Sequence, residues 1–196
     1  MNCRSARVVR ETDETRVELE LTVDGSGRSV VDSGVRMFDH LLTQVARHGS
    51  FDLTVSATGD DQHHTVEDVA ICLGQAFNQA LGDKKGIVRM SHASVPMDEA
   101  LSSVAVDISG RGGGYVFAPF TATMIGDLES DLVRHFLVTF AVEGRVTLHA
   151  RVECGLNDHH KAESLFKALA KALDGATLVD ARCPGEVPSS KGVLES

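Results

Sequence analysis

The segment His63-His64-Thr65-Val66-Glu67 recurs 96 positions later as His159-His160-Lys161-Ala162-Glu163. The similarity continues upstream at an offset of 95, with the matches His40 and His135, Leu42 and Leu137, Ala46 and Ala141, Gly49 and Gly144, and Leu53 and Leu148. One inserted loop residue accounts for the change of offset. Matching histidines, glutamates and glycines at nearly constant spacing indicate an internal duplication. We therefore expect one compact unit with a first half over 1–95 and a second half over 96–196.

Apolar periodicity predicts a similar order of elements in both halves. Alternating residues predict strands at 8–11, 15–23, 51–57 and 146–152, with further strands near 87–94 and 103–108. Helical spacing predicts helices over 38–47, 66–81, 128–142 and 160–173, the last closed by Asp174-Gly175. Residues 111–114 are expected to form a turn or mobile loop, and 183–196 an extended loop. Helices grouped beside antiparallel hairpins indicate the α+β class, with sheets packed against helices.

Composition excludes several classes of protein. The chain has 196 residues, 42% of them apolar, which is enough for a core and excludes a disordered chain. Its formal charge of −9 argues against non-specific nucleic-acid binding, and no apolar run is long enough for a membrane-spanning helix. The four cysteines are far apart and the chain start lacks an apolar signal, so we expect reduced thiols in a cytoplasmic protein.

The repeated His-His-x-x-x-Glu pattern has the spacing of metal ligands. Residues four apart on a helix share one face, so His63 and Glu67 can bind one ion while His64 points elsewhere. If the halves pack about a pseudo-twofold axis, within the chain or between subunits, the two resulting sites are His63, Glu67, His135 and His160, and His159, Glu163, His40 and His64. Three imidazoles and one carboxylate suit manganese or iron better than a structural zinc site, which more often includes thiolates.

Basic residues are few, and several lie together in three segments. These are Lys84-Lys85-Gly86-Ile87-Val88-Arg89, Ser109-Gly110-Arg111 and Ser189-Ser190-Lys191-Gly192. Guanidinium, ammonium and hydroxyl groups are suited to binding a phosphate. Each segment taken alone is equally compatible with a solvated turn.

Several of these segments, in this order, resemble one known family. They are Asp39-His40-Leu41-Leu42, residues 63–68, residues 81–87, Pro96-Met97-Asp98-Glu99-Ala100-Leu101, Ser109-Gly110-Arg111, residues 159–164 and residues 188–192. The chain is similar over about 7–194 to the imidazoleglycerol-phosphate dehydratases. Ser190 stands where that family usually has threonine, Gly112 replaces a common proline, and Arg36-Met37 replaces more aromatic residues.

The resemblance implies a fold, an activity and an assembly. The implied fold is two like halves of the ribosomal protein S5 domain 2-like type. The implied reaction converts imidazole glycerol phosphate to imidazole acetol phosphate and water in histidine biosynthesis. The implied assembly is a homo-oligomer of 24 subunits built from trimers, with two Mn²⁺ ions per active site at subunit contacts. The family's metal ligands fall on His40, His63, His64, Glu67, His135, His159, His160 and Glu163.

The resemblance also implies the other site residues. Those predicted as catalytic are Glu14, His64 and Glu163, with Glu14 as the candidate acid or base. Gln44 and His48, together with Glu14, are implied to contact the substrate. The implied phosphate ligands are Arg89, Arg111, Ser189, Ser190 and Lys191. Nothing in periodicity or spacing distinguishes Glu14 from Glu11 or Asp13.

The chemistry of the substrate explains the need for a metal. The proton to be removed is not next to a carbonyl, so a simple enolate route is closed. The imidazole ring can accept the electrons if it loses its N–H and becomes a metal-bound imidazolate. Two alternatives use the same ligands: a dinuclear metal-dependent phosphoester hydrolase, which would release free phosphate, and a non-catalytic metal-binding shell protein, which would need neither Glu14 nor the 189–191 segment.

Overall fold

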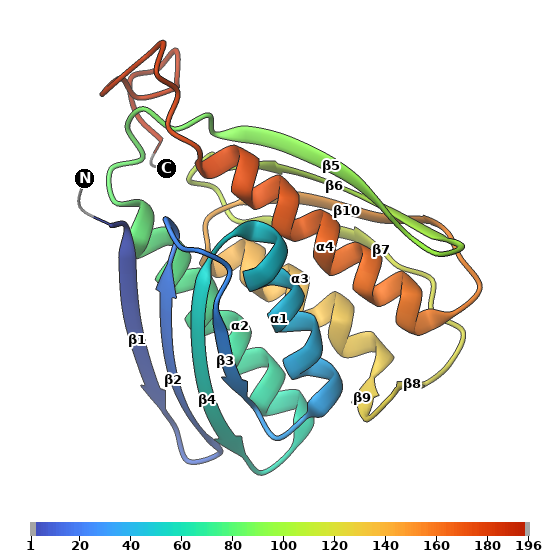
Figure 1. Ribbon diagram of the computed structural model, residues 1–196. Helices are drawn as coiled ribbons and strands as arrows, with labels where there is room; N and C mark the ends of the chain where they lie inside the picture. Colours follow the sequence, from blue (N-terminus) through green and yellow to red (C-terminus); the bar gives the residue numbers. More distant parts are fainter. Residues whose placement is uncertain (1–2, 195–196) are drawn as a thin grey trace.

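The computed structural model describes residues 3–194, and these form two four-stranded sheets with four helices between them (Figure 1). Residues 195 and 196 of the expected C-terminal loop lie outside the described residues. The first half contains strands β1 (Ser5–Glu11), β2 (Thr15–Thr22), β3 (Ser29–Asp32) and β4 (Asp52–Gly59) and helices α1 (Arg36–Gly49) and α2 (Gln62–Leu81). Its sheet has the order β1-β2-β4-β3, with β3 parallel to β4.

The second half repeats this order of elements. It contains strands β5 (Met90–Met97), β6 (Ala100–Asp107), β7 (Gly113–Phe117) and β10 (Thr147–Cys154), helices α3 (Ser130–Glu143) and α4 (Asp158–Thr177), and an inserted hairpin of β8 (Met124–Ile125) and β9 (Leu128–Glu129). The sheet order β5-β6-β10-β7 corresponds strand for strand to that of the first half, and β7 is parallel to β10. Because β5 belongs to the second sheet, the sheets divide the chain between α2 and β5, earlier than the expected boundary at residue 95.

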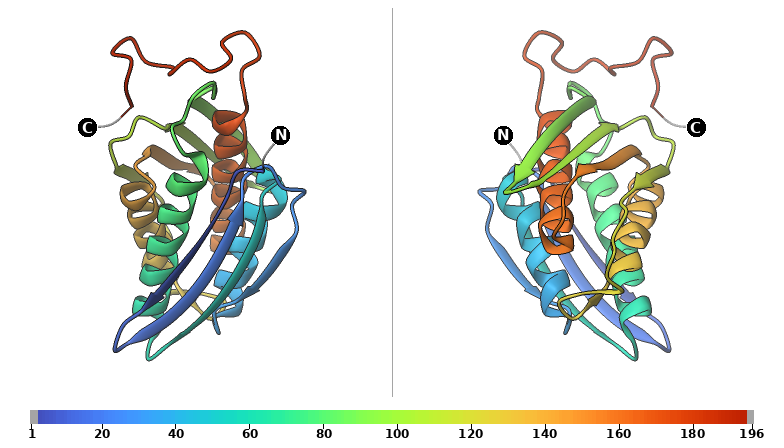
Figure 2. Two further views of the ribbon diagram at one scale, coloured as in Figure 1. Left: turned by 90° about the vertical axis from the view of Figure 1, so that its left-hand side faces the viewer. Right: turned by 90° about the vertical axis from the view of Figure 1, so that its right-hand side faces the viewer.

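The core lies between the two sheets and joins the halves. Inward residues alternate along each inner strand, as with Val17, Leu19 and Leu21 of β2, which are buried. Helix α1 packs against α4, and α2 packs against α3, so each half covers the other's helices (Figure 2). Gly74 of α2 permits the second of these contacts, because a Cβ there would lie 2.7 Å from the backbone nitrogen of Gly144. No described helix is long and apolar enough to cross a membrane.

Two of the differences from the predicted elements place glycines in close packing contacts. Gly113 and Gly114 were expected in a loop but lie in β7, where a Cβ on Gly114 would meet the Cα of Val138 at 2.7 Å. Helix α4 was expected to close at Asp174-Gly175 but continues to Thr177, and Gly175 instead allows the helix to lie close to Ser91 of β5. Residues 128–129 form strand β9 rather than the first turn of α3, and the short strands β3 and β8 were not predicted.

Candidate metal centre and phosphate pocket

Glu67 lies beside two histidines at one end of the helical layer. Helix α2 begins at Gln62, with Asp61 as its N-cap, so His63 and Glu67 lie one turn apart on the same face. Helix α3 contributes His135, whose Nε2 is 3.3 Å from a carboxylate oxygen of Glu67. The rings of His63 and His135 have centroids 4.7 Å apart. We refer to His63, Glu67 and His135 as the Glu67 group.

Glu163 lies in the equivalent arrangement at the start of α4. The Nε2 atoms of His40 and His159 lie 2.9 Å and 3.1 Å from the same carboxylate oxygen of Glu163, and Lys167 Nζ lies 2.7 Å from the other oxygen. Burial alone would raise the pKa of Glu163, but hydrogen bonds from Lys167 and His40 outweigh it and hold the pKa at about 2. We refer to His40, His159 and Glu163 as the Glu163 group.

Both groups fit a divalent metal ion in their donor chemistry. In each group one ligand atom per residue lies within 4.8 Å of the others. His135 Nε2 is buried and makes no hydrogen bond, because its contact with Glu67 lacks hydrogen-bond geometry, so its lone pair is available to a cation. Two imidazoles and a carboxylate leave coordination positions open for further ligands. Three of the four residues predicted for each site therefore lie together within one chain.

The fourth residue predicted for each site points elsewhere. His64 Nδ1 lies 2.8 Å from Asp60 Oδ1, and His160 Nδ1 lies 2.7 Å from Glu99 Oε2. Backbone donors led by Asn157, together with His160, lower the pKa of Glu99 to about 2, so Glu99 is ionised at neutral pH. His64 and His160 thus lie outside both three-residue groups in this chain.

A hairpin in the second half fixes the helices that carry these ligands. Val35, the N-cap residue of α1, provides no side-chain hydrogen bond, and Asp127 accepts from the backbone nitrogens of Arg36 and Met37 instead. Gln62, next to His63, donates to the carbonyl of Asp127 and accepts from the nitrogen of Glu129. Sequence analysis missed Asp127. The lack of a capping side chain at Val35 was the available signal.

The predicted phosphate ligands surround one pocket of about 370 Å³. It is lined by Arg89, Ser109, Arg111, Ser189, Ser190, Lys191, Val193 and Leu194. Arg89 is oriented by two hydrogen bonds to Asp107, at 2.7 Å and 3.0 Å, and by a third to the carbonyl of Pro188. Hydroxyls, two guanidinium groups and an ammonium group converge here, which is the chemistry that a phosphate requires. Ser109 also lines this pocket, although it was not among the predicted phosphate ligands.

The remaining predicted residues lie in the first half of the chain. Glu14, in the β1–β2 turn, has a carboxylate oxygen 3.7 Å from His64 Nε2. Gln44 lies one turn after His40 on α1, and its side chain contacts the carbonyl of His40 at 3.5 Å. His48 follows one turn later. Burial and then Lys167 and Lys171 lower the pKa of His48, which favours its neutral form.

The metal groups and the phosphate pocket lie at opposite ends of the folded molecule. His159 and Glu163 lie in the first turns of α4, whereas Ser189, Ser190 and Lys191 belong to the segment after its C-terminal end, which is drawn in red above the helices in Figure 1. Helix α4 has 20 residues and is therefore about 30 Å long. One small substrate cannot contact both regions of the same chain.

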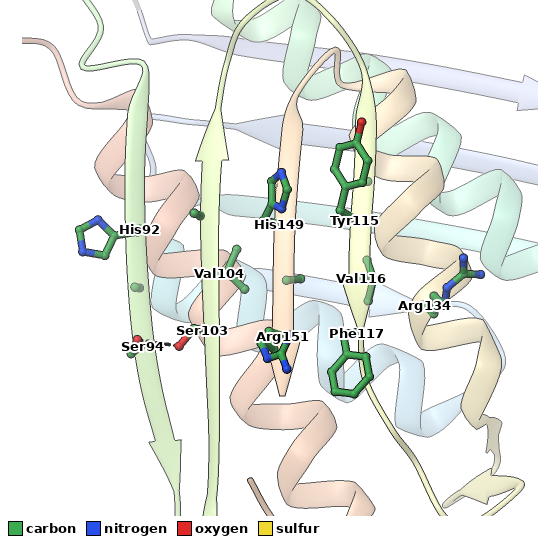
Figure 3. A pocket seen from close by; sticks show the side chains of 14 residues that line it. His92, Ser94, Ser103, Val104, Tyr115, Val116, Phe117, Arg134, His149 and Arg151 are labelled. Carbon is green, nitrogen blue, oxygen red and sulfur yellow. Dashed lines mark hydrogen bonds between the residues drawn. The ribbon is translucent and has the colours of Figure 1, made fainter. Parts of the chain in front are cut away.

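A larger hollow, of about 780 Å³, lies on the outer face of the second sheet (Figure 3). His92, Ala105, His149 and Tyr115 form one cross-strand row there, with Tyr115 stacked on His149, and Arg151 lies over the ring of Phe117. It contains none of the predicted site residues. Its size reflects an open sheet face with small residues at the centre, and we do not assign the catalytic centre to it.

Comparisons with known proteins identify the family of this chain. The family model "Imidazoleglycerol-phosphate dehydratase" matches residues 33–173, which include all eight predicted metal ligands. A Dehalococcoides mccartyi protein named imidazoleglycerol-phosphate dehydratase is 58% identical over 196 residues, covering 100% of both chains. A Roseiflexus protein of the same name is 55% identical over 194 residues, covering 97% of this chain and 98% of the relative.

Solved structures show the same fold. The imidazoleglycerol-phosphate dehydratase of Staphylococcus aureus superposes with a TM-score of 0.82 at 32% identity, covering 89% of this chain and 99% of that one. The enzyme from Pyrococcus furiosus, solved in complex with (S)-C348, superposes with a TM-score of 0.83 at 32% identity, covering 95% and 99%. The chain belongs to the imidazoleglycerol-phosphate dehydratase family, and it is a metal-dependent dehydratase of histidine biosynthesis that acts on a phosphorylated small molecule.

Proposed function

We propose that the catalytic centre of this dehydratase is assembled between copies of the chain and holds two Mn²⁺ ions. The observation that carries the proposal is the separation, by the length of α4, of the metal groups from the phosphate pocket. A substrate whose ring binds at the metal groups needs a phosphate pocket from another copy. His64 and His160, which lie outside their own chain's groups, then complete the groups of neighbouring copies. We include in the proposal the homo-oligomer of 24 subunits built from trimers that the family resemblance implies.

The donor set supports manganese as the metal. Each completed group would offer three imidazoles and one carboxylate, which are nitrogen and oxygen ligands of the kind that Mn²⁺ accepts with open octahedral positions. A divalent cation at such a group, when bound, orients the substrate's imidazole ring and favours its anionic form. His64 and Glu163 belong to the catalytic set as ligands at this centre.

The chain's other residues bind the substrate and move its protons. Arg89, Arg111, Ser189, Ser190 and Lys191 bind the phosphate group. Gln44 and His48 lie one and two turns after His40 on α1, and they contact the middle portion of the substrate. Glu14 is the proton-transferring carboxylate of the proposal. It acts at the carbon that keeps its hydroxyl, while the hydroxyl of the ring-adjacent carbon leaves as water. The resulting enol tautomerises to the ketone product.

Free thiols support a cytoplasmic location. Cys3, Cys72, Cys154 and Cys183 all lie in the described part of the chain, and all four are free. Reduced cysteines are typical of compartments in which disulfides do not persist. We include this location in the proposal.

Complementation between two impaired variants, assayed at substrate concentrations below the KM of either, tests the shared site. Glu14 lies near the metal groups and Lys191 lines the phosphate pocket, at the opposite end of the folded molecule. A site built between copies therefore takes these two residues from different chains. Glu14→Gln and Lys191→Ala proteins are each freed of metal, mixed, and reassembled with Mn²⁺. We expect the mixture to regain activity, because some sites receive intact residues from both chains. A mixture no more active than its components would contradict shared sites.

The product distinguishes the dehydratase from the hydrolase alternative. Purified protein is incubated with imidazole glycerol phosphate and Mn²⁺, and ketone and inorganic phosphate are both measured. We expect ketone with the phosphate group retained. Free phosphate without ketone would indicate hydrolysis, and neither product would indicate a non-catalytic shell.

A further inference from the structure

Two carboxylates outside the predicted site contact the two histidines that lie apart from the metal groups. Glu99, in the turn between β5 and β6, has Oε2 2.7 Å from His160 Nδ1. Asp60, just before α2, has Oδ1 2.8 Å from His64 Nδ1. Sequence analysis assigned no role to either carboxylate. Each contact leaves the other ring nitrogen, Nε2, without a strong partner, because its nearest carboxylate oxygen is 3.7 Å away in both cases.

The chemistry of each contact determines which nitrogen of the ring carries the proton. An ionised carboxylate only accepts hydrogen bonds, so Nδ1 must be the donor in both pairs. In a neutral imidazole with the proton on Nδ1, Nε2 carries the free lone pair and can bind a metal. Carboxylates commonly fix metal-binding histidines in this way.

Backbone hydrogen bonds from the residues just before α4 also hold the Glu99 side chain. Its other oxygen, Oε1, accepts from the backbone nitrogens of Leu156 and Asn157, at 3.1 Å and 2.8 Å. Asn157 is the N-cap of α4, and its side chain accepts from the nitrogens of His159 and His160. Glu99 therefore joins the β5–β6 turn to the first turn of α4 and fixes the ring of His160 relative to both.

We propose that Glu99 and Asp60 are positioning residues that hold His160 and His64 in the Nδ1-protonated form with Nε2 directed out of the chain, ready to bind a metal ion held by a neighbouring copy. This rests on the proposed function, because His160 and His64 lie outside the metal groups of their own chain. The pairs differ in origin. Asp60 is four residues from its histidine, whereas Glu99 is 61 residues from its own. In both halves the histidine Nδ1 thus contacts a carboxylate, but the two carboxylates come from different segments of the fold.

Glu99→Gln tests the proposal by changing which ring nitrogen of His160 carries the proton. The glutamine oxygen can still accept from Leu156 and Asn157, but its NH₂ group then faces His160 Nδ1 and favours the form protonated at Nε2. Nitrogen-15 NMR of the metal-free, histidine-labelled full chain reads the two forms separately. We expect wild-type His160 to be protonated at Nδ1 and the variant to shift towards Nε2.

Metal binding gives the second measurement. Loss of such a carboxylate costs about 10- to 100-fold in metal affinity in other proteins. We expect Glu99→Gln to weaken Mn²⁺ binding in calorimetric titration by that range, and to raise the Mn²⁺ concentration needed for assembly. Glu153→Gln, the same change at an exposed carboxylate of β10 paired with Arg151, is the matched control and should alter neither measurement.

The two measurements separate this proposal from the proposed function. An unchanged His160 protonation pattern together with unchanged Mn²⁺ affinity in Glu99→Gln would overturn the positioning role. If the wild type binds Mn²⁺ without assembling, the shared centre fails, whereas the protonation result still decides the role of Glu99. Should Glu99→Gln not fold, Asp60→Asn gives the same two measurements at His64.

Discussion

The Glu67 group and the Glu163 group contain the same ligands in different surroundings. The Glu67 side chain is 39% exposed, whereas that of Glu163 is 8% exposed and carries Lys167 on one oxygen. Position 71, which corresponds to 167 in the duplicated pattern, is isoleucine. A cation approaching Glu163 must compete with an ammonium group, and a cation approaching Glu67 meets none at that position. Duplication has thus preserved the ligand spacing, while a single neighbouring residue makes the two groups electrostatically unequal.

Chelation should have the largest effect on the protein, and it should remove metal from the two groups at different chelator concentrations. If metal bridges copies of the chain, its removal favours smaller oligomers by mass action, without unfolding the chain. Titration with a chelator, followed by light scattering and metal analysis, should show loss of mass together with loss of Mn²⁺. We expect the Glu163 group to release its ion first. An unchanged mass after complete metal removal would contradict metal-dependent assembly.

Glu14→Gln should reduce kcat by at least about 100-fold, the lower end of what a positioned proton-transferring group contributes. Metal content and assembly should be preserved, because Glu14 lies outside both metal groups. Substrate binding should persist, because glutamine keeps the shape and hydrogen bonding of the side chain. Glu11→Gln is the control and should be nearly neutral.

Asp98→Asn extends the same measurement to the second half. Asp98 lies 3.7 Å from His160 Nε2, as Glu14 does from His64 Nε2. A loss of kcat in Asp98→Asn alone would reverse our assignment of the proton transfer to the first half.

Lys191→Ala should raise KM strongly and leave metal content intact. A hydrogen bond to a charged group is worth about 1.5–3 kcal/mol, so kcat/KM should fall about 10- to 100-fold. Steady-state kinetics with metal analysis measure both quantities. Wild-type kinetics in this variant would show that the 189–191 segment does not bind the phosphate.

Lys167→Ile should have the smallest effect, and it tests the inequality of the two groups directly. The substitution gives the Glu163 group the residue found at the corresponding place beside Glu67. Removing one nearby positive charge should tighten Mn²⁺ binding there about tenfold, since charge interactions near a protein surface amount to a few kcal/mol at most. Calorimetry should show the two binding steps converging. Ile71→Lys should weaken binding at the Glu67 group, and equal affinities in the wild type would refute the comparison.

The sequence was sufficient for features that depend on local spacing. The two His-x-x-x-Glu pairs follow from helical geometry, and their third ligands, His40 and His135, follow from the repeat. Strands such as β2 were predicted because their inward residues alternate regularly. Strand β3 has four residues and little burial, so its pattern is too short to recognise.

Features that depend on distant partners could not be predicted from the sequence. Asp127 caps a helix that begins 91 positions earlier, and Glu99 contacts a histidine 61 positions away. A glycine such as Gly175 is typical of a helix end. In the folded chain it lies inside α4, where its lack of a side chain allows a close contact with Ser91. In the proposed assembly the metal partners of His64 and His160 Nε2 belong to neighbouring copies, and the sequence of one chain does not specify how those copies pack.

Each metal group takes one ligand from the other half of the chain, and this fixes the timing of metal binding during synthesis. His63 and Glu67 emerge from the ribosome well before His135, and His40 emerges long before His159 and Glu163. A nascent first half therefore presents only partial ligand sets, and α1 still lacks the cap that Asp127 provides. The Glu67 group cannot close on an ion until translation has passed His135 in α3, and the Glu163 group cannot do so until α4 has been made. Chains truncated before α3 are therefore left without either full group, and chains truncated between α3 and α4 lack the Glu163 group.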